Sequence, residues 1–473
     1  MRLLLTGARV LDPDGELDRP PPQDVLIEDG RIVAVGSDIG ADGAERLDAA
    51  GCLLTPGFVN AHSHSHDALL RGRFEAIPLD VWGLGAFPGG WSRRSVHEIA
   101  LRTTLHAAEC LLGGITTVQD MVSLQGPDPA HLNAVLEAYR TSGIRAVVAL
   151  QFADRALAET VPFPTMLDGV APPGAPASMG DFVRSHLEPA PRLQWGLGPS
   201  APQRCSEALL RWTAALARER GLPVFTHLYE TRAQAVHAQA YGSHAAGLDG
   251  FEHLVVAHGV WIMPDEIARL GAAGAFLACN PVANLKLLNG VAPVRAYAEA
   301  GVRIALGCDN TSASDAQNIF QAMKAFALAW AMQGGSDPAA HAFRAATTGG
   351  ASALGLPDIG RIRLGATADL VLFDLGDPAW WPLNSAVRQL VYAETGRSVR
   401  HVIVEGQIVV RDRVLLTADT GSLATQAEAA RDRMDPELAA MQSRDADLRR
   451  ALQDIHARAA TVPLGFDQMR LAR

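Results

Sequence analysis

Two histidines one residue apart stand at the end of an apolar stretch. His62 and His64 follow residues 53–59, Leu-Leu-Thr-Pro-Gly-Phe-Val, whose composition predicts a buried strand. In a strand, residues i and i+2 face the same side, so both imidazoles can approach one point. Imidazole nitrogens that converge on one point are suited to binding a metal ion. The pair therefore predicts part of a metal site.

Three later segments carry side chains with related chemistry, and each segment follows an apolar run. They contain His227 with Glu230, His258, and Asp309. Three imidazoles and one carboxylate form a good ligand set for zinc or iron(II), with one position left open for water. We predict a divalent metal ion, with zinc preferred and iron(II) as the alternative. The predicted ligands are His62, His64, His227 and Asp309.

The polar residues at these strand ends also suit acid–base chemistry. Glu230 lies three residues after His227, where it can stand beside the ion without binding it and carry a proton between water and a substrate nitrogen. His258 can orient the attacking hydroxide and stabilise charge that develops at the attacked carbon. Asp309 can serve as a ligand and also accept the proton of the water. We predict Glu230, His258 and Asp309 as catalytic; the alternatives are a surface glutamate and a structural histidine.

The elements that must position these side chains form a repeating pattern. Apolar strand-like runs alternate with helical, alanine-rich stretches across residues 56–368. This alternation predicts an α/β fold, a TIM-like parallel (β/α)8 barrel that forms the catalytic domain. Barrel enzymes carry their functional residues at the C-terminal ends of the strands, which is where the predicted ligands fall.

The two ends of the chain have a different pattern. Residues 1–55 and 369–415 contain short strands with turns, such as the hairpin signal Glu-Asp-Gly-Arg at 28–31. We predict that the two parts form one small, discontinuous β-sandwich domain. Residues 416–473 are charged and alanine-rich at helical spacing, which predicts a C-terminal helical extension. A solvated surface and a partner-binding face are both compatible with that extension.

The ordered set of motifs resembles the amidohydrolase superfamily, specifically its cytosine deaminase and triazine hydrolase branch. The family pattern is a Pro-Gly-initiated strand that ends in H-x-H, a later H-x-x-E, an alanine–histidine pair, and an aspartate after a glycine. Residues 280–286 and 368–371 add further similarity. The resemblance covers nearly the whole chain except its C-terminal part.

This resemblance implies a reaction. Metal-bound hydroxide would attack an amino-substituted ring carbon of an N-heterocycle of the purine, pyrimidine, pterin or triazine type, and the intermediate would release ammonia or an amine. Relatives of the branch also expel halide or open a cyclic amide with the same residues. The alternatives are therefore a hydrolase that opens a cyclic amide and a non-catalytic scaffold of the same fold. Glu230 and His258 count against the scaffold, because neither is needed for ligation or folding.

The number of metal ions follows from a missing residue type. Many members of the superfamily hold two metals bridged by a carbamylated lysine. The lysines of this chain are Lys286 and Lys324, and none lies between His64 and His227. We therefore predict a single ion; a pair of ions bridged by a glutamate is the alternative, without positive support in the sequence.

The substrate pocket is less strongly marked in the sequence. Nucleoside-deaminating relatives often carry a histidine in a G-P-H-A-P segment, whereas this chain has Ser200 in Gly-Pro-Ser-Ala-Pro. This departure weakens an adenosine-type assignment, including S-adenosylhomocysteine. We predict a pocket for a small-molecule substrate; packing or turn roles are the alternative for its residues. They are Trp82, Gln203, Asn280 and Asn284.

Composition excludes several other classes. The net charge of −10 and the lack of a basic stripe argue against a nucleic-acid partner. The five cysteines are scattered without a C-x-x-C pair, which favours a reduced, cytoplasmic protein. No apolar run has the length of a membrane span or a signal peptide. We also expect a homodimer or a higher homo-oligomer.

Overall fold

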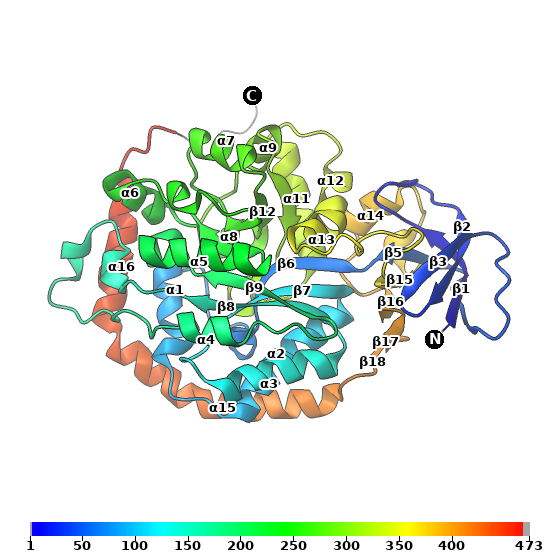
Figure 1. Ribbon diagram of the computed structural model, residues 1–473, viewed down its shortest axis with the longest axis horizontal. Coiled ribbons are helices and arrows are strands. Elements are labelled where there is room, and N and C mark those ends of the chain that lie inside the picture. The colour runs from blue at the N-terminus through cyan, green and yellow to red at the C-terminus, as the bar shows by residue number, and fades with distance from the viewer. Residues whose placement is uncertain (1, 467–473) are drawn as a thin grey trace.

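The computed structural model describes residues 2–466, which form two β-sheets with surrounding helices. Figure 1 shows one sheet inside a layer of helices and the other to the right of it, where blue N-terminal strands lie beside orange strands from late in the chain. The predicted α/β fold, a TIM-like barrel with a β-unit built from both chain ends, is confirmed.

The barrel sheet is entirely parallel, and its strands follow one another in chain order. Its strands are β6 (Phe58–His64), β7 (Ile115–Val122), β8 (Arg145–Phe152), β9 (Leu193–Pro199), β10 (Val224–Leu228), β11 (Leu254–His258), β12 (Phe276–Cys279), β13 (Arg303–Leu306) and β14 (Asp309–Asn310). Helices cover the outside of the barrel (Figure 1). They include α2 (Val96–Leu112), α3 (Pro129–Ser142), α5 (Glu207–Arg220), α6 (Arg232–Tyr241), α7 (Pro264–Ala272), α8 (Pro281–Lys286) and α11 (Ile319–Met332).

The last barrel strand changes its partner in the middle, and this change closes the ring. β13 pairs with β12, whereas β14 pairs with β6. Between them, a Cβ on Gly307 would lie 2.1 Å from Asn280 Oδ1, so only glycine fits. The Cys308 N–H donates to Asn60 Oδ1 at 2.9 Å, and Asn60 Nδ2 donates to Gln317 Oε1 at 2.9 Å. The Asn60 amide therefore holds the strand where the backbone ladder is interrupted.

The second sheet combines strands from both ends of the chain. Its strands are β1 (Arg2–Val10), β2 (Pro22–Glu28), β3 (Arg31–Gly36), β4 (Glu45–Asp48), β5 (Cys52–Pro56), β15 (Leu370–Asp374), β16 (Val399–Val404), β17 (Gln407–Arg411) and β18 (Val414–Leu415). The two ends meet where β5 runs antiparallel to β15. A separate apolar cluster that includes Leu5, Ile27, Leu54 and Leu372 lies in this unit. The strands are hydrogen-bonded into one mixed sheet, and the division into domains stays a prediction.

Two long helices follow the second sheet and pack back on the barrel. α15 (Thr420–Arg444) and α16 (Ala446–Thr461) run along the lower and left sides of the body in Figure 1, in orange and red. Met434, Leu438 and Met441 of α15 share an apolar cluster with Trp82 of α1 (Leu79–Ala86). The predicted extension, 416–473, lies partly outside the described residues. No helix within residues 2–466 combines the length and apolar character that a membrane span requires.

Candidate active site

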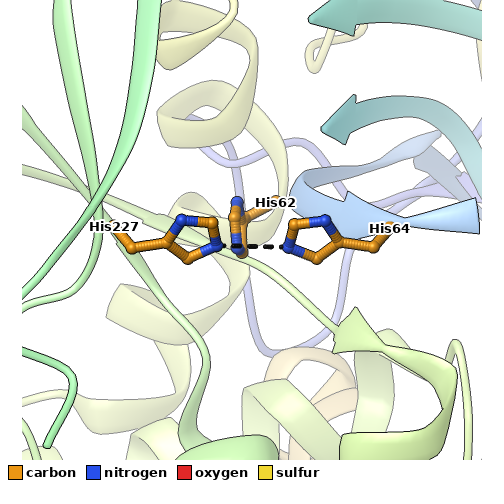
Figure 2. Close-up of side chains that lie close together, drawn as sticks. All are labelled: His62, His64 and His227. Carbon is orange, nitrogen blue, oxygen red and sulfur yellow. Dashed lines mark hydrogen bonds between the residues drawn. The ribbon is translucent and has the colours of Figure 1, made fainter. Parts of the chain in front are cut away.

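Three histidine rings converge at the C-terminal ends of β6 and β10. Figure 2 shows His62, His64 and His227 with their rings directed toward one another. His62 and His64 are buried on the same side of β6, as strand periodicity requires. The Nε2 atoms of His64 and His227 are 3.2 Å apart.

The hydrogen bonds of these rings fix which nitrogen faces the centre. His64 Nδ1 lies 2.8 Å from the Met121 carbonyl oxygen, and His227 Nδ1 lies 2.5 Å from that of Ser200. A carbonyl only accepts, so each Nδ1 must donate. In the neutral rings both Nε2 atoms then present lone pairs to each other, which is unfavourable unless a cation lies between them. Zinc–nitrogen bonds of about 2.0–2.1 Å at tetrahedral angles would separate two such nitrogens by about 3.3 Å.

Asp309 completes the ring of donors. Its Oδ1 is 3.7 Å from the Nε2 atoms of both His62 and His64. Asp309 has φ +61° and His258 has φ +71°, in the left-handed region that non-glycine residues seldom adopt. Such conformations cost about 1–3 kcal/mol and concentrate at functional sites. Here His258 is the last residue of β11 and Asp309 is the first residue of β14, and both lie beside the histidine cluster.

The donor set fits a metal ion. The ligand atoms of His62, His64 and His227 lie within 4.8 Å of one another, and so do those of His62, His258 and Asp309. Burial lowers the pKa of His62 and of His227 well below the ordinary value, and the neighbouring histidines lower it further. A lowered pKa favours the neutral form of each ring, which ligation requires. Within the described part of the chain, the buried His62 Nε2 has no hydrogen-bond partner. A cation would supply the missing interaction.

Glu230 and His258 lie as a pair next to the predicted ligands. Glu230 Oε2 is 3.6 Å from His258 Nε2. Burial raises the pKa of Glu230 to about 7; His258 opposes this shift, and Asp309 adds to it. Burial lowers the pKa of His258, but the carboxylates of Glu230 and Asp309 outweigh it and raise the pKa above the ordinary value. A carboxylate that titrates near neutral pH can both accept and donate a proton.

Two residues that the sequence analysis did not single out hold Glu230. Asn289 Nδ2 donates to Glu230 Oε1 at 2.9 Å, and the Glu230 backbone N–H donates to Gln234 Oε1 at 2.7 Å. Gln234 belongs to a capping box with Thr231 at the start of α6, so the Thr-x-x-Gln spacing was a usable signal. Asn289 follows α8 without any pattern that would single it out.

The four predicted pocket residues have different positions. Trp82 lines a small cavity beside the cluster and donates from Nε1 to Ser312 Oγ at 2.9 Å. Asn284 accepts from His258 Nδ1 at 2.8 Å, so it contacts a predicted catalytic residue. Gln203 and Asn280 are buried but do not line that cavity. Asn280 instead precedes α8 and packs against Gly307.

Two cavities adjoin at this end of the barrel. The inner one has a volume of about 20 Å³ and is lined by site residues together with Leu79, Trp82, Phe87, Ala201, Arg204, Gln234, Leu287 and Asn310. The outer one has a volume of about 660 Å³ and shares Phe87 and Arg204 with the inner one. The inner cavity has room for little more than water, whereas the outer one can hold a small molecule.

Comparison with known proteins assigns the family. The amidohydrolase family profile matches residues 53–409. A 5-methylthioadenosine/S-adenosylhomocysteine deaminase of Halobacterium salinarum is 33% identical over 438 residues, which cover 90% of this chain and 96% of the relative. The chain belongs to the amidohydrolase family. The corresponding deaminase of Syntrophobacter fumaroxidans is also 33% identical, over 88% of this amidohydrolase and 94% of the relative.

Solved structures resemble this amidohydrolase over most of its length. An adenosine deaminase from Xanthomonas campestris with bound zinc has a TM-score of 0.80 and 28% identity, covering 92% of this chain and 98% of its own. A mutant atrazine chlorohydrolase from Arthrobacter aurescens, in complex with zinc and atraton, has a TM-score of 0.80 and 25% identity, covering 91% and 100%. The predicted resemblance to this superfamily and branch is confirmed.

Proposed function

We propose that this amidohydrolase is a metal-dependent deaminase that hydrolyses the amino group of an aminopurine or triazine type of ring. The decisive observation is the convergence of three imidazoles and the Asp309 carboxylate beside a Glu230–His258 pair. Relatives and structural neighbours named as deaminases or triazine hydrolases support the proposal.

The proposed metal ligands are His62, His64, His227 and Asp309. The absence of lysine between His64 and His227 favours one ion, because the bridge of a binuclear site could not form there. Zinc is the preferred ion, since it is present in the structural neighbours, and iron(II) is the alternative. When bound, the ion supplies the positive charge that lowers the pKa of a water molecule towards about 7.

Glu230 is the proposed proton carrier. It faces the inner cavity, and Asn289 holds one of its oxygens, so the other oxygen is free to face the reacting atoms. With a pKa raised by burial to about 7, it can take a proton from the attacking water and deliver it to a ring nitrogen. Protonation of that nitrogen makes the ring carbon more electron-poor and so assists attack.

His258 and Asp309 have complementary proposed roles. The bond from His258 Nδ1 to Asn284 leaves Nε2 directed at the cluster, 3.9 Å from Asp309 Oδ2. A protonated Nε2 can donate to the oxygen that adds to the ring carbon and stabilise its negative charge. Asp309 can hold the second proton of the water and release it to the departing amino group, which leaves as ammonia.

Ammonia release from zinc-loaded protein tests the function. Adenine, adenosine, cytosine and melamine represent the purine, nucleoside, pyrimidine and triazine types. We expect stoichiometric ammonia from at least one purine or triazine. Failure of every compound, or ring opening of a cyclic amide such as hydantoin in their place, would contradict the proposal. Ser200 stands where nucleoside deaminases often carry histidine, and its Oγ accepts a hydrogen bond from Gln151 Nε2 at 2.7 Å. The assay with adenosine tests whether the protein accepts a nucleoside despite this difference.

Assembly and location stay predictions. We expect a homodimer or a higher homo-oligomer, which light scattering during gel filtration would measure. A monomer at micromolar concentration would contradict it. Cytoplasmic location rests on the reduced cysteines; Cys52, Cys110, Cys205, Cys279 and Cys308 are all free and buried.

A further inference from the structure

The two cavities meet at a boundary formed by Phe87 and Arg204. The inner cavity of about 20 Å³ is too small for a heterocycle, whereas the outer cavity has a volume of about 660 Å³. A substrate whose amino-bearing edge reaches Glu230 must therefore extend past this boundary. The substituents of its ring then lie beside the Arg204 side chain.

Arg204 is the only arginine or lysine that lines the inner cavity within residues 2–466. Its guanidinium carbon lies 5.6 Å from the centre of the Phe87 ring, and its Nη2 is 3.8 Å from Asp80 Oδ1. The second distance exceeds that of a hydrogen bond. The guanidinium forms no hydrogen bond with any described residue, although its side chain is only 21% exposed.

Asp80 is engaged by a different partner. His456 of α16 approaches Asp80 Oδ2 with its Nε2 at 2.8 Å. Asp80 is therefore hydrogen-bonded to the C-terminal helix, and with Arg204 it forms only a long ion pair of 3.8 Å that leaves the guanidinium donors without a hydrogen bond. The planar donor set of Arg204 remains available at the cavity boundary.

The remaining cations of the outer cavity are placed differently. Arg444 hydrogen-bonds to Asp445, which lines the same cavity. Arg155 lines the outer cavity but not the inner one. The Arg155 side chain also has no hydrogen bond to a described residue, but within residues 2–466 only Arg204 combines such free donors with a position at the inner cavity.

We infer that Arg204 is a specificity-determining residue that selects substrates with an anionic group, such as a carboxylate, on the part of the molecule that leaves the inner cavity. This inference rests on the proposed deaminase function. A guanidinium binds carboxylate or phosphate oxygens through two parallel hydrogen bonds. Phe87 would pack against the ring at the same boundary, as aromatic side chains do.

A pair of compounds that differ in one charge tests the inference. Adenosine 5′-carboxylate and adenosine 5′-carboxamide have nearly the same shape. Zinc-loaded wild-type protein should prefer the acid by about tenfold or more in kcat/KM, mainly through KM, as a charge-assisted hydrogen bond predicts. In Arg204→Gln the acid-to-amide ratio should fall to about one, and Arg204→Lys should restore part of it. Arg155→Gln, the matched control at the outer cavity, should keep the wild-type ratio.

Equilibrium binding separates this inference from the proposed function. Calorimetric titration of both compounds into the zinc-loaded Glu230→Gln variant, with and without Arg204→Gln, gives the same ratio without turnover. Acid-selective binding that depends on Arg204, without ammonia release by the wild type, would contradict the proposed chemistry and support the role of Arg204. Equal binding of acid and amide, or loss of selectivity in Arg155→Gln in place of Arg204→Gln, would overturn the inference.

Discussion

Replacing Glu230 with glutamine isolates the proton transfer that the proposed reaction requires. The side chain is buried beside His258 and accepts from Asn289 Nδ2 at 2.9 Å. Glutamine keeps the length of the side chain and can still accept this bond through its amide oxygen. It cannot carry a proton between water and a ring nitrogen. Metal binding and folding should therefore persist while turnover is lost.

The expected loss of kcat depends on which other proton-carrying groups line the inner cavity. Among the described residues, Asp309 is the only other carboxylate that lines it, and its proposed role as a ligand restricts its use as a base. General acid–base catalysis contributes about 10²–10⁴-fold. Because Asp309 is already assigned the second proton of the water, it cannot also take over the role of Glu230, and we expect a fall in kcat of about 10³-fold or more within this range.

The dependence of kcat/KM on pH provides a second test of the role of Glu230. Burial raises the pKa of Glu230 to about 7, and a bound cation favours the ionised form, so the acid limb of kcat/KM should lie at or below about pH 7. Because the ionised form is the base, the rate should fall as the pH falls through this limb. In Glu230→Gln the limb should be absent.

The assay measures ammonia release, zinc content by mass spectrometry and thermal unfolding on the same preparations. Glu266→Gln is the matched control, because Glu266 is also buried and accepts from Tyr229 Oη at 2.6 Å outside the cavity. Near-normal turnover of Glu230→Gln with full zinc content would refute the mechanism at its central step. Equal losses in both variants would show that the effect is structural.

Three further predictions follow from the ligand set and its surroundings. Wild-type protein should contain about one zinc per chain, and His62→Ala should lose zinc and activity together, as metal analysis would show. Two ions per chain, with activity that depends on both, would contradict the single site. Asn284→Leu should retain zinc but lower kcat about 10–100-fold, since His258 Nδ1 loses its acceptor; an unchanged kcat would exclude that role. Burial lowers the pKa of His62 and His227 in the fold, so below about pH 6.5 the unfolded chain binds protons that the folded chain does not. The Tm of metal-free protein should therefore fall from pH 7 to pH 5 in calorimetry, less steeply in His62→Ala, and a Tm that rises would contradict this reasoning.

The sequence by itself determined the features that depend on local periodicity. His62 and His64 face one side because they are two residues apart on β6. Strand–helix alternation predicted the parallel barrel, and the barrel places the ends of its strands on one face. Because His227, Glu230, His258 and Asp309 lie at or just after the ends of apolar runs in the sequence, their convergence could be predicted without knowledge of any contact.

Only the tertiary structure decided which residues support the site. Asn284 was predicted in the substrate pocket but contacts His258, and Asn289 contacts Glu230 from 59 residues away. The hydrogen-bond partners of His64 and His227 are the backbone carbonyls of Met121 and Ser200. Every residue has such a carbonyl, so the residue type does not reveal these partners. The contact of His456 with Asp80 spans 376 residues. Such contacts depend on which loops and helices meet after the ring closes, and no periodicity along the chain encodes that meeting.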